Sequence, residues 1–208
     1  MNSHLAVFAR RGFVAASIIV FAFFGYGCGG SNSSFSAQFA PSATATAVDL
    51  IKLVPKTTSG GRIVVQAVIY GPDAGQDMYS FAFDVKIGDP TVLKFMTNSA
   101  VAGNALSASA GQTITVQAGP DVSDATHIVV GVTKVGGGPG NGVGGSLASP
   151  VIIVSLTFQV LKQGTSTLAI AAGPTAPTVL DHNGAAINAI TFDTADGSVT
   201  AISTGGGY

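Results

Sequence analysis

Side chains that could carry out catalysis are few in this chain. All ten acidic residues are aspartates, and there is no glutamate among the 208 residues. Glycoside hydrolysis needs two carboxyl groups that face each other across a cleft, whereas these aspartates are scattered along the chain. Four of them lie beside Gly or Pro: Asp73, Asp89, Asp121 and Asp196. An Asp in such a position bonds to nearby backbone in a turn, so the sequence predicts turns and no hydrolytic pair.

Metal and nucleophile patterns are also missing from the sequence. His4, His127 and His182 have no Cys or Glu at metal-ligand spacing, so zinc is not expected. No Gly-x-Ser-x-Gly motif is present, and the glycine-rich run 136–145 lacks the Gly-Lys-Ser/Thr ending of a phosphate loop. That run therefore predicts a mobile hairpin loop, and the chain is expected to have no enzymatic activity.

Calcium binding stays open as an alternative. Asp181, Asn183 and Asp193 lie near one another in the sequence and carry oxygen atoms of the kind that calcium prefers. Their spacing differs from that of an EF-hand, so the prediction is of no resident metal, with calcium as the one candidate ion.

The stretch 79–95 is the clearest structural signal in the chain. Its apolar residues alternate with polar ones, which is typical of a half-buried strand. The predicted inward side chains are Tyr79, Phe81, Phe83, Val85 and Ile87, and the outward ones are Ser80, Ala82, Asp84 and Lys86. Asp84 is the one aspartate in mid-strand, so it is a candidate partner contact, with a solvated charge as the alternative.

Strands of this kind follow one another along the rest of the chain, with turn residues between them. They are predicted at 48–54, 62–70, 79–87, 92–97, 113–117, 127–135, 151–161, 166–172, 187–192 and 198–203. The predicted fold is all-β: a two-sheet antiparallel β-sandwich with jelly-roll topology and about nine strands. The predicted core includes Ile63, Val65, Ala67, Ile69, Ile128, Val130, Val132, Ile152, Val154, Leu156, Phe158 and Val160.

The N-terminal region indicates export. Arg10 and Arg11 precede an apolar run at 12–24, which predicts a signal peptide over 1–27, with an uncleaved anchor as the alternative. Cys28 follows directly and resembles the lipidated cysteine of a bacterial lipoprotein; the other reading is an incidental cysteine after an ordinary secretory signal. The domain prediction continues with a flexible tether at 28–45, a sandwich at 46–203 and a disordered tail at 204–208. The protein is expected to be exported and held at the bacterial cell envelope or surface by this lipid or by the anchor. Without either attachment, it is expected to be secreted.

Composition limits the partners. Only 9% of the residues are charged, and the formal net charge is −1, so the basic patch that nucleic acid requires is absent. A single cysteine excludes an internal disulfide framework. The fold must depend on its hydrophobic core.

The order of motifs resembles a cohesin domain. The motifs that carry the resemblance are Asp-Pro-Thr-Val-Leu at 89–93, Val-Ala-Gly-Asn-Ala-Leu at 101–106, Leu-Thr-Phe-Gln-Val at 156–160, Gly-Thr-Ser-Thr-Leu at 164–168, Asp-His-Asn-Gly at 181–184 and Asp-Gly-Ser-Val at 196–199. Cohesins bind dockerins, which are small calcium-loaded helical modules, through one open sheet face. The resemblance implies a non-catalytic surface module with a dockerin-bearing protein as its partner.

The implied contact surface follows from the strand alternation. It comprises Ser80, Ala82, Asp84, Lys86, His127, Val129, Thr133, Ser155 and Thr157, together with Gly131 and Gln159. Several cohesins use an Asn and an Asp on the third strand to bind dockerin, and Ser80 and Ala82 stand at those positions here. Polysaccharide binding is the alternative function, although the chain has no Trp and only Tyr70, Tyr79 and Tyr208 after the signal.

Overall fold

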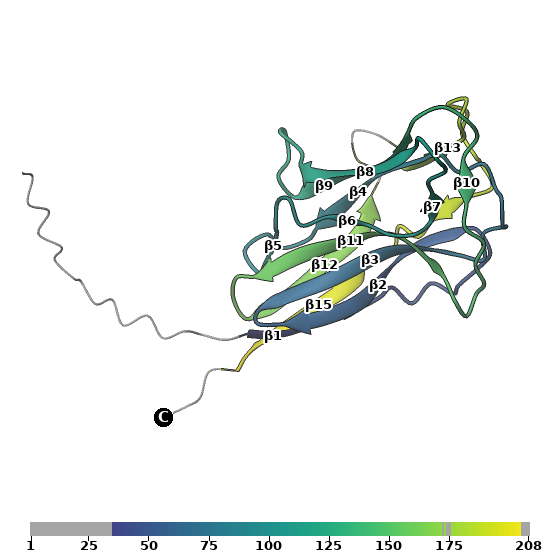
Figure 1. The fold of residues 1–208 in the computed structure, drawn as a ribbon. Helices are drawn as coiled ribbons and strands as arrows, with labels where there is room; N and C mark the ends of the chain where they lie inside the picture. Colours follow the sequence, from purple (N-terminus) through teal and green to yellow (C-terminus); the bar gives the residue numbers. More distant parts are fainter. Residues whose placement is uncertain (1–34, 172, 174–175, 205–208) are drawn as a thin grey trace, which may run out of the picture. The chain divides into compact units, whose positions relative to one another are not determined.

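The computed structural model describes residues 35–171, 173 and 176–204 (Figure 1). These residues belong to one compact unit, Asn32–Tyr208. The predicted signal peptide at 1–27, Cys28 and the tail at 205–208 lie outside the described residues. The described part of the chain contains strands and no helix, so the all-β prediction is confirmed.

The larger sheet has seven strands, and all of its pairs are antiparallel. Its order is β1 (Phe35–Ala40), β15 (Gly197–Ser203), β12 (Gly164–Ala171), β4 (Ser80–Ile87), β9 (His127–Val135) and β8 (Thr113–Pro120), and β13 (Thr178–Leu180) also pairs with β4. β4, which belongs to the stretch 79–95, lies between β9 on one side and β12 and β13 on the other.

The second sheet has six strands and completes a sandwich with jelly-roll topology (Figure 1). Its order is β14 (Thr191–Phe192), β2 (Leu50–Ser59), β3 (Arg62–Tyr70), β11 (Val151–Val160) and β5 (Leu93–Phe95), and β6 (Val101–Ala102) also pairs with β11. A separate ladder joins β7 (Leu106–Ser107) to β10 (Asn141–Gly142). The additional short strands explain why the described residues contain fifteen strands rather than about nine.

The core lies between the two sheets, as the alternation of apolar residues predicts. Phe81, Phe83 and Val85 of β4 are each at most 1% exposed. Across from them, the rings of Phe95 and Phe158 in the second sheet meet edge to face, with centroids 5.7 Å apart. Burial of such aromatic and aliphatic side chains stabilises the sandwich without any disulfide.

The predicted core position of Ile152 is wrong. The register between β11 and β3 shifts between Ile152 and Val154, as in a β-bulge. Ile153 and Val154 are both buried, whereas Ile152 is only partly buried. A bulge changes which side chains face inward, and strict alternation cannot predict it.

The predicted flexible tether over 28–45 is also wrong for its second half. β1 forms a six-residue antiparallel ladder with β15, and Phe39 lies opposite Val199 with 3% of its surface exposed. Ser42 is buried as well. The sandwich therefore begins by Phe35 instead of residue 46, because two alternate apolar side chains, Ala37 and Phe39, complete the core.

Candidate functional site

Seven of the nine predicted contact residues share the outer face of the seven-stranded sheet. Across β4 and β9, Ser80 lies opposite Thr133, Ala82 opposite Gly131, Asp84 opposite Val129 and Lys86 opposite His127. Residues that are directly opposite in an antiparallel pair point to the same side of the sheet. The structure thus brings these side chains together as one surface. The neighbouring strand β8 extends this surface beyond β9, so we call it the β8–β9–β4 face.

Ser155 and Thr157 do not belong to this face. They lie on β11, which is a strand of the second sheet, and they pair with Gln66 and Val64 on β3. The prediction of one shared surface is therefore wrong for these two residues. Strand alternation distinguishes inward from outward side chains, but it does not tell which sheet a strand joins.

The middle of the β8–β9–β4 face is shallow because its side chains are small. Gln117 and Gly119 of β8 lie opposite Gly131 and Val129 of β9, and a Cβ added at Gly131 would meet nothing within 4 Å. Val129 stands beside this depression with 40% of its surface exposed. The result is an open, uncharged patch with one exposed aliphatic side chain.

Charged groups gather at one end of the face. Asp84 points outward from β4, yet it is 1% exposed, and its Oδ2 lies 3.6 Å from Nδ1 of His127. The other ring nitrogen of His127, Nε2, lies 3.7 Å from Oδ2 of Asp124. Burial raises the pKa of Asp84; the nearby His127 opposes that rise, and the Asp121 carboxylate adds to it.

Asp121 has the turn role that the sequence predicts, and Asp124 in the same turn between β8 and β9 has a similar role. Oδ1 of Asp121 accepts hydrogen bonds from the hydroxyl (2.5 Å) and backbone N–H (2.6 Å) of Ser123. Oδ1 of Asp124 accepts equivalent bonds from Thr126 at 2.6 and 2.9 Å. These bonds lower the pKa of both carboxyl groups, and the bond from the hydroxyl has the larger effect in each case. Both groups therefore remain charged near neutral pH.

The residues considered for calcium do not form a shared site in the described structure. Oδ1 of Asp181 accepts backbone hydrogen bonds from Asn183 and Ala185, both at 2.8 Å. Asp193 instead accepts hydrogen bonds from Ser42 and Thr44. His182 pairs with Asp77 at 2.5 Å. The described residues contain no group of three or more His, Cys, Asp or Glu side chains arranged to hold a metal, and calcium binding stays a prediction.

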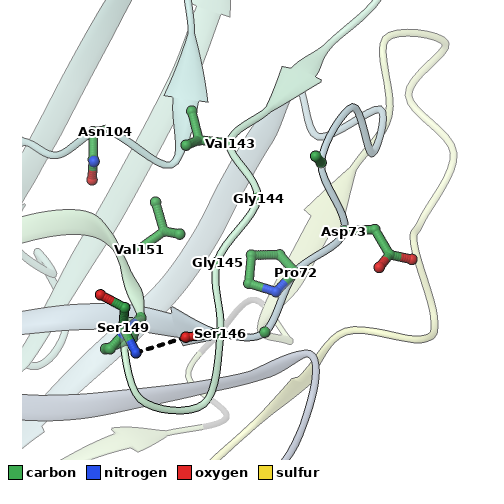
Figure 2. Close-up of a pocket in the computed structure, with 12 residues that line it drawn as sticks. Pro72, Asp73, Asn104, Val143, Gly144, Gly145, Ser146, Ser149 and Val151 are labelled. Atoms are coloured by element: carbon green, nitrogen blue, oxygen red, sulfur yellow. Dashed lines mark hydrogen bonds between the residues drawn. The ribbon is translucent and has the colours of Figure 1, made fainter.

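The glycine-rich run 136–145 does not form the predicted hairpin loop. It connects β9 in one sheet to β11 in the other, and its middle forms β10. Together with the turn at 71–74, it borders a pocket that also includes Asn104, Ser146 and Ser149 (Figure 2). Within this pocket the backbone N–H of Ser149 donates to Oγ of Ser146 at 3.0 Å. Asp73 is the one ionisable residue of the lining, so the pocket holds no acid–base pair for catalysis.

Among the described residues, no helix has the length and apolar character needed to cross a membrane. The sequence matches no family model and no curated protein. Solved structures that are similar to this chain include cohesin modules.

Three of these structures illustrate the likeness. The second type II cohesin module of the ScaA scaffoldin from Acetivibrio cellulolyticus is 13% identical, with 78% of this chain and 88% of that chain covered and a TM-score of 0.47. Type II cohesin A11 from Bacteroides cellulosolvens is 12% identical, with coverages of 71% and 96% and a TM-score of 0.45. A cohesin module from a Clostridium perfringens glycoside hydrolase is 9% identical, with coverages of 82% and 96% and a TM-score of 0.40.

Proposed function

We propose that this chain is a non-catalytic module that binds a protein partner through the β8–β9–β4 face. The observation that carries the proposal is the open, uncharged centre of that face, where Gly131 and Ala82 leave room beside exposed Val129. Protein interfaces are depleted of charge at their core and depend on close packing there. A partner side chain placed on this patch would bury Val129 without the cost of desolvating a charge.

A dockerin-bearing protein is the partner that the order of sequence motifs favours. Ser80 and Ala82 replace the hydrogen-bonding Asn and Asp of several cohesins, so the partner would be held mainly by apolar packing at this point. Calcium enters the proposal through such a partner, because dockerins are loaded with that ion. The chain itself is proposed to act without a cofactor.

Polysaccharide is the alternative ligand, and aromatic rings argue against it. Sugar-binding surfaces stack exposed aromatic rings on the apolar faces of the sugar, whereas Phe81, Phe83 and Phe158 are buried in the core. The Tyr79 hydroxyl donates to the carbonyl of Gly136 at 2.6 Å. In the described part of the chain, the β8–β9–β4 face therefore presents no aromatic platform.

We further propose that the module is exported and held at the cell envelope through a lipid on Cys28. The support is the sequence alone: a positive segment, an apolar run and a cysteine directly after it. Mass spectrometry of the mature N-terminus tests this proposal. A diacylglyceryl group on Cys28 supports it, and an unmodified N-terminus at another residue contradicts it.

Affinity capture with the Asn32–Tyr208 unit tests the binding function, with and without calcium. The decisive variant is Gly131→Arg, which places a large side chain on the open centre of the face. The matched control is Thr157→Arg on the outer side of the other sheet. We expect the first substitution to abolish capture of the partner and the second to leave it intact.

Loss of capture with Thr157→Arg but not with Gly131→Arg would place the binding surface on the second sheet and contradict the proposal. Retention on insoluble cellulose or chitin, with no protein captured, would favour the polysaccharide alternative. Turnover of a glycoside by the purified unit would contradict the non-catalytic proposal.

A further inference from the structure

A cluster of titratable side chains adjoins the proposed contact patch. It contains Asp84 on β4, His127 on β9 and Asp124 in the turn between β8 and β9. The two ring nitrogens of His127 face one carboxylate each, at 3.6 Å for Asp84 and 3.7 Å for Asp124. The imidazole thus stands between two acidic groups, and each separation is longer than a hydrogen bond.

Asp84 is enclosed even though its strand position points out of the sheet. A Cβ built at Gly173 would come within 1.4 Å of its Oδ2, so the backbone at Gly173 passes directly over the carboxylate. Among the described residues, neither Oδ2 of Asp84 nor Nδ1 of His127 has a hydrogen-bond partner. Burying an ionised carboxylate without a donor is costly, so a proton held between these two atoms would stabilise the pair.

The other charged groups around His127 are mostly acidic. β4 contributes Lys86, which lies directly opposite His127 and is exposed. The turn contributes Asp121 and Asp124, while β12 presents Ala169 and Ala171 opposite Lys86 and Asp84. One lysine and three carboxyl groups therefore surround the ring.

We propose that Asp84, His127 and Asp124 form a proton-responsive element that regulates binding at the β8–β9–β4 face. This inference rests on the proposed function. When His127 takes a proton from solvent, the imidazolium lies between two carboxylates and can donate to both. When the proton leaves, the buried Asp84 carboxylate faces a neutral ring. Because Asp84 lies directly opposite Val129, this change occurs beside the contact patch. Protonation of His127 reduces the net negative charge of the three groups there, so the apolar partner surface proposed above binds more tightly at mildly acidic pH.

An NMR titration of the Asn32–Tyr208 unit tests the element without any partner, between about pH 8 and pH 5 where histidine titrates. The His127 ring and the backbone amides of Val129 and Gly131 are expected to change with one shared midpoint. Asp84→Asn and Asp124→Asn should each lower that midpoint by about half a pH unit or more, because each removes a carboxylate that favours the imidazolium.

An unchanged His127 midpoint in both variants would overturn the inference. The inference would also be overturned if the amide signals of Val129 and Gly131 in the wild type did not change with the same midpoint as the His127 ring. This second outcome needs no variant, so the test does not depend on whether a variant folds. His127→Gln supplies a further check, since the pH response of the two amides should disappear with the imidazole.

Binding of the captured partner separates this inference from the proposed function. We expect a Kd about threefold to tenfold lower near pH 5.5 than near pH 8 for the wild type, the range that one ordinary hydrogen bond spans, and no such difference for His127→Gln. Capture with equal affinity at both pH values would overturn the proton-responsive element and leave the binding function standing. Failure to capture any protein at either pH would overturn the binding function, and the NMR titration would then decide the element by itself.

Discussion

Ser42 donates its hydroxyl to Oδ2 of Asp193, although 151 residues separate the two in the sequence. Thr44 donates to the other carboxylate oxygen at 2.9 Å, and Nζ of Lys52 donates to the backbone carbonyl of Ser42, also at 2.9 Å. Lys52 and Asp193 are 6% and 7% exposed, with Nζ and Oδ2 3.8 Å apart. This buried network joins the segment after β1 to β2 and to the turn before β15.

Removal of the segment before residue 46 should therefore destabilise the sandwich. A 46–208 fragment lacks β1 and both hydroxyl partners of Asp193, and it exposes the core beside Phe39. We expect its free energy of unfolding to be lower than that of the Asn32–Tyr208 unit by about 3 kcal/mol or more, since a buried charge pair loses its partners. Denaturant titration of the two fragments measures this difference. Equal unfolding midpoints would show that β1 is dispensable.

Asp193→Ala should destabilise the protein in a pH-dependent way. Burial alone would raise the pKa of Asp193, but hydrogen bonds from Ser42, the Ala195 backbone and Thr44, with the charge of Lys52, hold it below its ordinary value. A lowered folded-state pKa gives stability that is present above the unfolded value of about 3.9 and is lost as the pH falls through the folded value. At neutral pH we expect a loss of about 3 to 5 kcal/mol, because Lys52 stays buried without its counter-ion.

Denaturant titration at several pH values checks that expectation. The matched control is Asp196→Ala, three residues further on and exposed, which should change the free energy of unfolding by about 0.5 kcal/mol or less. A pH-independent loss in Asp193→Ala would argue that the side chain acts through packing instead of charge.

The sequence predicts which side chains point inward, but it predicts less well which strands assemble into which sheet. Phe81 and Phe83 are core residues because alternate positions of a half-buried strand share one face, and the structure confirms them. Ser155 is outward by the same rule, but it lies on the other sheet. Sheet membership depends on pairings such as that of Gln66 with Ser155, which link distant parts of the chain and leave no local pattern.

The strand β1 and the burial of Asp84 could not be predicted from the sequence, for related reasons. The segment that contains β1 is rich in Ser, Ala and Thr, so its composition suggests a tether; only the alternation of Ala37 and Phe39 could have indicated a strand. The sequence predicts Asp84 as a partner contact or a solvated charge, because its enclosure depends on Gly173, which is 89 residues away in the sequence. Burial by a crossing segment is a tertiary property.

Asp84→Asn should stabilise the protein above neutral pH. Burial raises the pKa of Asp84, so the folded state favours the neutral carboxyl group. Stability from this group is fully present below the unfolded value of about 3.9 and is lost as the pH rises through the folded value. Near pH 8 the neutral amide avoids that loss, and we expect a gain of about 1 kcal/mol in the free energy of unfolding. A loss of stability near pH 8 would mean that the ionised carboxylate is well paired.

Lys134→Met should also stabilise the protein at neutral pH. Lys134 is 2% exposed, and its Nζ has no hydrogen-bond partner among the described residues. Burial lowers its pKa, although the Asp77 carboxylate opposes this. Stability is therefore reduced while the lysine is charged, and it recovers as the pH rises through the folded pKa towards the unfolded value of about 10.4.

The expected gain for Lys134→Met near pH 7 is about 1 to 3 kcal/mol, as when a buried charge is replaced by an apolar side chain of similar volume. Thermal and denaturant unfolding would measure it. Exposed Lys162 provides the control, and Lys162→Met should be neutral within about 0.5 kcal/mol. A large loss in Lys134→Met would show that the ammonium group makes a structural contact.

Gly103→Ala and Gly131→Ala should differ sharply although both add one methyl group. A Cβ at Gly103 would lie 2.1 Å from the backbone oxygen of Ile152, at a point where the Gly103 N–H donates to Ile153 at 2.8 Å. The backbone must move, and β6 loses its pairing with β11, so we expect a loss of about 2 kcal/mol or more. A Cβ at Gly131 meets open space, and its effect on the free energy of unfolding should stay within about 0.5 kcal/mol. Denaturant titration compares the two variants directly, and similar losses in both would contradict the open centre that the proposed contact patch requires.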